Sequence, residues 1–156
     1  MKALIEGSHG LLIKKYSFEN IIIFSGRTGS GKTYQINKYI ELDFTKKLLL
    51  ASVGDCKYEF VKVKNLTKIS YYDTFFSVPP VDKFKSLFTI LETQIKNSYD
   101  VIIMDNVSFD TYQQINKLFY LCLSYPNTKF FITIDEKISL NEENEDFSRF
   151  FLKNDQ

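Results

Sequence analysis

One octapeptide near the beginning of the chain combines residue types that can bind phosphate. The sequence GRTGSGKT at residues 26–33 fits the pattern G-x-x-x-x-G-K-[ST] at every position. Its glycines lack a Cβ and adopt backbone conformations closed to other residues, so successive N–H groups can turn inward around an anion. The residues predicted to form this phosphate-binding loop are Gly26, Arg27, Thr28, Gly29, Ser30, Gly31, Lys32 and Thr33.

Two side chains of the loop have distinct expected roles. The Lys32 ammonium would lie against the β- and γ-phosphates, and the Thr33 hydroxyl would ligate Mg²⁺. The helix expected after the loop adds its unpaired N–H groups and the positive end of its dipole. The sequence therefore predicts a nucleoside triphosphate site, with ATP as the expected nucleotide because no guanine-reading N-K-x-D segment occurs. The alternative is a flexible glycine turn before a helix.

A carboxylate later in the chain fits the same chemistry. Asp105 ends the apolar run VIIMD, and such a strand leaves its carboxylate at the C-terminal edge of a sheet, where it holds magnesium through water. Many buried strands end in Asp, but this one follows a complete phosphate-binding loop at a sensible separation. We therefore expect Asp105 to be the Walker B residue and the second protein group at the Mg²⁺ ion.

The rest of the pattern supplies the elements that would position these residues. Gly7 and Gly10 interrupt two short apolar segments, so residues 1–19 are expected to form a loose helix or turn at the edge of the core. Alternation around Asn65 predicts one or two short strands, in KYEFVKV and TKISYYD. Apolar runs and helical periods predict the sequence strand 21–25, helix 34–42, strand 47–53, helix 81–96, strand 99–106, helix 110–123 and strand 129–134.

This order predicts the fold class. Strands that alternate with helices favour an α/β fold, with a mostly parallel sheet and helices on both faces in a three-layer sandwich. The 156 residues suit a single domain, with residues 1–19 at its edge and an acidic C-terminal segment at residues 141–156. A content of 44% hydrophobic and 16% aromatic residues indicates a folded chain.

Charge and cysteine content narrow the function classes. The net charge of +1 gives no general attraction to nucleic acid, so such binding would need a local patch. The lysines of residues 57–68 are either a solvated strand face or such a patch. Cys56 and Cys122 do not form a zinc or disulfide pattern, and no signal peptide or long apolar span is present, so we expect free thiols and a cytoplasmic protein. His9, the single histidine, is expected in an exposed turn.

Between about residues 20 and 135, the chain resembles the RecA-like and hexameric-helicase branch of the P-loop NTPases. The octapeptide GRTGSGKT carries the superfamily resemblance, while an extra strand before VIIMDN, the stretch KISYYDTFFSV and the following helix resemble the branch in pattern. The octapeptide also looks like that of secretion, pilus-retraction and DNA-translocation motors. The resemblance implies ATP hydrolysis in DNA handling or macromolecular transport, by a homo-oligomer or with a larger partner. It also implies that Thr133 and Asp135 lie where many P-loop ATPases sense the γ-phosphate.

Two departures from the resemblance concern catalysis. Asn106 follows Asp105, where many such ATPases have a glutamate, and an amide cannot act as a general base. RecA-like members place a carboxylate after the second strand, which makes Asp55 the candidate base or a plain turn aspartate. Besides Arg27, the chain has one arginine, Arg149, which is either a finger acting across a subunit boundary or a surface residue.

Two other functions fit part of the pattern. A small nucleoside or nucleotide kinase has a similar length, and IIMDNVSF loosely resembles the Walker B segment of thymidine kinases. The several arginines of monophosphate kinases and the zinc cysteines of thymidine kinases are nevertheless absent from the sequence. A nucleotide-dependent switch or scaffold without turnover is favoured by Asn106 and by the small size of the chain.

Overall fold

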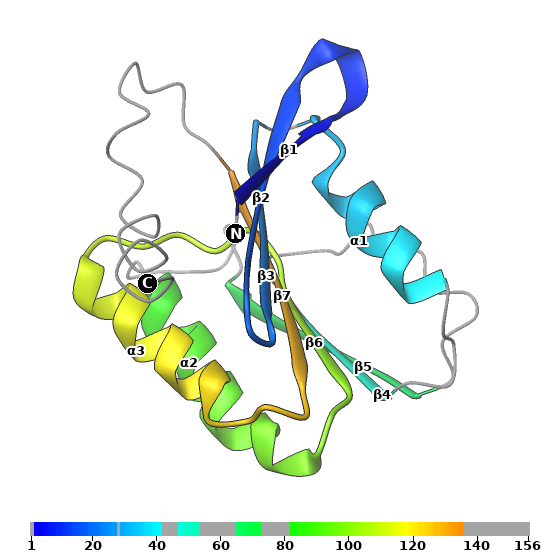
Figure 1. Cartoon of the computed structure of the whole chain (residues 1–156). Coiled ribbons are helices and arrows are strands. Elements are labelled where there is room, and N and C mark those ends of the chain that lie inside the picture. Colours follow the sequence, from blue (N-terminus) through cyan, green and yellow to red (C-terminus); the bar gives the residue numbers. More distant parts are fainter. Residues whose placement is uncertain (1, 28, 42–46, 54–64, 73–81, 136–156) are drawn as a thin grey trace.

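The computed structural model describes residues 2–27, 29–41, 47–53, 65–72 and 82–135. These residues form an α/β fold with a seven-stranded sheet in the order β1-β2-β3-β7-β6-β4-β5 (Figure 1). The strands are β1 (Lys2–Glu6), β2 (Leu12–Phe18), β3 (Ile21–Gly26), β4 (Lys47–Val53), β5 (Asn65–Tyr72), β6 (Val101–Met104) and β7 (Lys129–Asp135). The described helices are α1 (Lys32–Glu41), α2 (Lys83–Gln94) and α3 (Tyr112–Leu123).

The sheet is mixed, and most of it is parallel. Strands β3, β7, β6, β4 and β5 pair in parallel, while β1 and β2 add an antiparallel hairpin beside β3. The prediction of a mostly parallel sheet is therefore confirmed. Of the two short strands expected around Asn65, the second is β5, and KYEFVKV lies outside the described residues.

Helices cover both faces of the sheet, as predicted. Helix α1 lies on one face, and α2 and α3 lie together on the other (Figure 1). The central strands are buried on both sides because their side chains alternate between two cores, as Leu49 and Leu50 of β4 illustrate. Leu49 belongs to the cluster that includes Leu87 of α2 and Leu118 of α3. Leu50 belongs to the cluster that includes Ile36 of α1.

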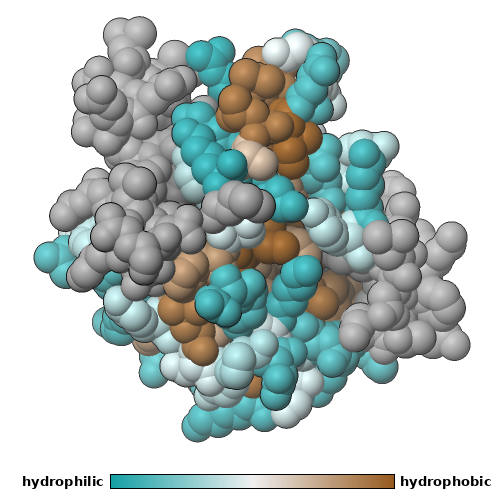
Figure 2. All heavy atoms as spheres, in the orientation of Figure 1, coloured by the Kyte–Doolittle hydropathy of each residue, from teal (hydrophilic) through white to brown (hydrophobic). Residues whose placement is uncertain are grey.

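The N-terminal prediction was wrong. Residues 2–18 form the β1–β2 hairpin instead of a loose helix or turn, and its connection contains a short 3-10 turn at Ser8–Gly10. His9 and Gly10 both lie in the left-handed region, with φ of 57° and 71°, so the chain reverses direction there. Leu4 and Leu12 are 62% and 57% exposed on this hairpin, and apolar surface is visible at the top of Figure 2. His9 is exposed in a turn, as predicted.

The helices on the second face start at side-chain caps. Asp82 accepts a hydrogen bond from the N–H of Lys85 at the start of α2, and Thr111 accepts one from Gln114 at the start of α3. Cys122 of α3 is a fully buried free thiol, and burial raises its pKa. Cys56 lies outside the described residues. None of the described helices is long and apolar enough to cross a membrane.

One side chain ties the turn before β3 to the end of α3. The Asn20 amide nitrogen lies 2.9 Å from each of three backbone oxygens, those of Cys122, Tyr125 and Thr128. The backbone oxygen of Asn20 also accepts a hydrogen bond from Phe130 at 2.8 Å. Together, these contacts fix the start of β3 against the start of β7, so the opposite ends of the two strands are also held in register.

Candidate functional site

The site forms where three neighbouring strands end at the carboxyl edge of the sheet. Gly26, the last residue of β3, is paired with Asp135, the last residue of β7. On the other side of β7, Met104 of β6 is paired with Ile132, and Asp105 follows directly. Because β7 lies between β3 and β6, it is the strand that connects the glycine loop with the Walker B candidate.

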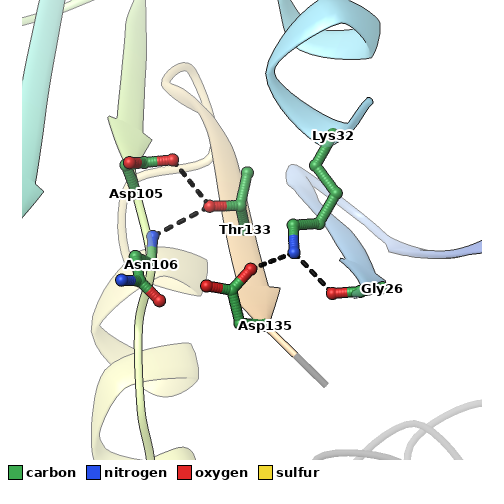
Figure 3. Close-up of polar contacts among 6 residues, drawn as sticks. All are labelled: Gly26, Lys32, Asp105, Asn106, Thr133 and Asp135. Atoms are coloured by element: carbon green, nitrogen blue, oxygen red, sulfur yellow. Dashed lines mark hydrogen bonds and ion pairs between the residues drawn. The ribbon is translucent and has the colours of Figure 1, made fainter. Parts of the chain in front are cut away.

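Lys32 begins α1, and its side chain extends back across the loop to this edge. Its ammonium donates to the backbone oxygen of Gly26 and forms an ion pair with Asp135 (Figure 3). The Lys32 side chain is only 9% exposed, whereas that of Asp135 is 38% exposed. A buried ammonium is costly without partners, and Gly26 and Asp135 supply two acceptors for it.

A second set of contacts holds the Walker B candidate. The Thr133 hydroxyl donates to the Asp105 carboxylate at 2.8 Å and accepts from the backbone N–H of Asn106 at 2.8 Å (Figure 3). Thr133 is only 2% exposed, so its hydroxyl has little access to water. Asn106 has a φ of 58°, in the left-handed region that Asn tolerates better than most residues. Thr133 therefore orients both the carboxylate and the turn that follows it.

Tyr71 at the end of β5 holds the same turn from the other side. Its hydroxyl lies 2.7 Å from the backbone oxygen of Asp105 and 3.0 Å from that of Asn106, to which it donates. Burial and, to a smaller extent, the charge of Asp105 raise the pKa of Tyr71, so the hydroxyl keeps its proton at neutral pH. The sequence marked Tyr71 as part of a strand, but nothing in the local pattern indicated its contact with Asp105.

Two glycines of the loop have left-handed backbone conformations. Gly29 and Gly31 have φ values of 84° and 100°, in the left-handed region where side chains are strained. Nothing lies within 4 Å of the position that a Cβ would take on Gly29, so this part of the loop borders open space. Helix α1 starts at Lys32, directly after the loop, and its first N–H groups have no intrahelical acceptor.

The turn of the N-terminal hairpin packs against this loop. The backbone N–H of Ser8 donates to the backbone oxygen of Ser30 at 2.8 Å. A Cβ on Gly7 would lie 2.1 Å from that same oxygen, and a Cβ on Gly31 would lie 3.1 Å from the Ser8 hydroxyl. The close approach therefore depends on two glycines. A five-residue connection with two glycines between apolar segments is a hairpin signal that could have identified this contact.

The structure brings together some of the predicted residues. Lys32 is buried at the edge, next to the end of β3. Asp105 directly follows β6, which β7 separates from β3, and it contacts Thr133 of β7. Thr33 is half-buried in the first turn of α1, and Arg27 is exposed. Among the other residues of interest, Thr28, Asp55 and Arg149, together with Lys57, Lys62 and Lys64, lie outside the described residues, and Lys68 is exposed on β5.

The described residues supply hard oxygen ligands at the loop and at β6. Mg²⁺ at phosphate sites takes one or two protein oxygens and completes its shell with water and phosphate. The Thr33 hydroxyl and the Asp105 carboxylate match that donor set. In the described part of the chain, no group of three or more His, Cys, Asp or Glu side chains could hold a metal ion by itself.

Comparison of the chain with protein-family models, with curated proteins and with solved structures finds no match.

Proposed function

We propose that this protein binds ATP with Mg²⁺ at the carboxyl edge of its sheet and hydrolyses it as a RecA-like P-loop domain. It would act in DNA handling or macromolecular transport, as a homo-oligomer or with a larger partner. The observation that carries the proposal is the loop between β3 and α1, with Gly29 and Gly31 in left-handed conformations and the buried Lys32 ammonium at the strand ends. Such an arrangement would offer backbone N–H groups and one cation to an anion.

The side chains at the edge would divide the work as follows. Lys32 would donate to the β- and γ-phosphate oxygens. Thr33 and Asp105 would hold Mg²⁺, which neutralises charge on the phosphates, and Thr133 would keep the Asp105 carboxylate in place. Asp55 as the base and Arg149 as a finger in trans stay predictions from the sequence.

A nucleotide-dependent switch is the second candidate. It is favoured by Asn106, which directly follows Asp105 and has no protonation state that could activate water. The described carboxylates at this edge are also engaged, Asp105 with Thr133 and Asp135 with Lys32. A switch would bind ATP tightly, release little phosphate and be indifferent to Asp55→Asn.

Binding and turnover, measured together, test these proposals. Calorimetry with Mg-ATP should show binding that falls by about 100-fold in Lys32→Ala, because a charged hydrogen bond to phosphate contributes up to about 3 kcal/mol. Lys38→Ala is the matched control, since Lys38 is exposed on the same helix and contacts Tyr34. Absence of ATP binding to the wild-type protein at millimolar concentration would refute the proposal.

Phosphate release with and without single-stranded DNA, beside the mass of the protein with and without ATP, separates the function classes. A motor should release phosphate faster with DNA or a protein partner. Phosphate transfer to a nucleoside, unaffected by DNA, would instead support the kinase alternative. Binding without release would support the switch.

A further inference from the structure

The ion pair between Lys32 and Asp135 has a feature that the proposed function does not require. A lysine ammonium has three N–H donors. In this structure, one donates to the backbone oxygen of Gly26 and a second to the Asp135 carboxylate. A nucleotide can therefore take up one donor without disturbing either contact, but it can take up two only by displacing an acceptor.

We propose that Asp135 competes with the γ-phosphate for Lys32, so that the ion pair survives when a nucleoside diphosphate binds and breaks when a triphosphate binds. This inference rests on the proposed function. The β-phosphate of a diphosphate would occupy the third donor. The γ-phosphate of a triphosphate needs a further donor, and the Asp135 carboxylate is the anion that occupies it.

Burial decides which partner moves. The Lys32 side chain is 9% exposed, and Lys32 begins α1, so its ammonium has few positions besides the strand ends. The Asp135 side chain is 38% exposed, and Asp135 is the last residue of β7, so its carboxylate can turn to water when a phosphate replaces it. Gly26 is part of the β3–β7 ladder, so its backbone oxygen cannot turn away as a side chain can. Asp135 is therefore the displaceable acceptor.

The position of Asp135 links this exchange to the rest of the site. Asp135 follows Thr133 by two residues on the same strand, and Thr133 holds Asp105 and the N–H of Asn106. When the Asp135 carboxylate leaves Lys32, the change therefore occurs on β7, the strand whose Thr133 orients Asp105, the proposed Mg²⁺ ligand. Asp135 acts here as a residue that sets nucleotide preference, and its contact with Lys32 distinguishes the two nucleotide states.

The test measures how Asp135→Asn changes the ratio of the affinities for a nucleoside triphosphate and a nucleoside diphosphate. Removing the competing charge should strengthen binding of a non-hydrolysable ATP analogue by about tenfold and that of ADP by less than about threefold, both with Mg²⁺. Asp135→Glu restores the charge and should return the ratio of the two affinities toward the wild-type value. Asp100→Asn is the control, because Asp100 is exposed at the opposite edge of the sheet, where it accepts from the backbone of Lys47.

The outcomes separate this inference from the proposed function. If the wild-type protein binds neither nucleotide, the proposed function fails, and this inference fails with it. If it binds both and Asp135→Asn leaves the ratio unchanged, or if Asp135→Glu behaves as Asp135→Asn does, only the competition is refuted. Urea unfolding of each variant shows whether the fold is intact, and a destabilised Asp135→Asn would leave the Asp135→Glu ratio as the deciding measurement.

Discussion

Replacing Thr133 by valine removes one hydroxyl and keeps the shape of the side chain. In the wild-type protein, this hydroxyl donates to Asp105 and accepts from the N–H of Asn106, each at 2.8 Å. The N–H of Asn106 would be left without its acceptor beside a side chain that is 2% exposed. The Asp105 carboxylate would lose the hydrogen bond from Thr133, and because it is half-buried, water would replace that bond in part.

These lost hydrogen bonds set the expected change in the free energy of unfolding. A buried donor left unpaired costs about 1–3 kcal/mol, and a hydrogen bond to a charged group contributes about 1.5–3 kcal/mol. Allowing for hydration of Asp105, we expect Thr133→Val to lower the free energy of unfolding by about 2–4 kcal/mol. That loss corresponds to a urea midpoint lower by about 1–2 M. Thr133→Ser keeps the hydroxyl and loses a buried methyl group, for about 1 kcal/mol.

Two assays check this reasoning. Urea denaturation followed by circular dichroism should place Thr133→Val well below Thr133→Ser in stability. Calorimetry should show that Thr133→Val weakens Mg-ATP binding relative to Thr133→Ser, while ATP without Mg²⁺ binds both variants alike, because only the metal ligand has lost its support. Equal urea midpoints for the two variants would show that the hydroxyl does not hold Asp105, and the account of this site would then be wrong.

Two further predictions concern stability. Folding raises the pKa of Tyr71, so the stability it contributes is complete below the ordinary tyrosine pKa of about 10 and falls at higher pH. The free energy of unfolding, measured in urea at about pH 8 and about pH 10.5, should therefore drop more for the wild type than for Tyr71→Phe. Asn20→Ala should cost about 1–3 kcal/mol, because the oxygens of Cys122, Tyr125 and Thr128 lose the amide donor, while those of Cys122 and Tyr125 keep a backbone donor. Asn20→Asp should cost more in the same assay, since its carboxylate would face those oxygens, and an unchanged midpoint would contradict the contact.

Local patterns in the sequence were sufficient to locate the elements around the glycine loop and Asp105. The strand before the glycine loop, the helix after it and the strand before Asp105 all follow from apolar runs and periodicity over a few residues. The left-handed conformations of Gly29 and Gly31 follow from the residue type. Such signals are local, and they predicted the two faces of the sheet as well, because a parallel sheet needs helical crossovers.

The pairing of strands was beyond those patterns. Lys32 and Asp135 are 103 positions apart, and their contact depends on β7 lying beside β3 with Gly26 opposite Asp135. A shift of one residue in that register would turn the Asp135 side chain to the other face of the sheet. The sequence placed Asp135 at a strand end, but only the register brings it to Lys32.

The N-terminal hairpin was missed for a different physical reason. Strand β1 is exposed along most of its length, so it lacks the alternation that identifies a half-buried strand. What holds it is the backbone pairing to β2 and the contact of its turn with the glycine loop. The side chains of such an exposed edge strand show little of the pattern that identifies a strand. Gly7 and Gly10, in the connection, were therefore interpreted as interruptions of two apolar segments.

That hairpin changes how the glycine loop must be understood. The N–H of Ser8 donates to the backbone oxygen of Ser30, and this contact fixes the orientation of that peptide in the loop. Under the proposed function, a loop that is fixed in this way would lose less conformational entropy when it binds phosphate. The same turn also excludes a side chain at Gly7, where a Cβ would lie 2.1 Å from Ser30. The N-terminal hairpin therefore supports the glycine loop, and we expect a chain that lacked it to retain the octapeptide but lose this support.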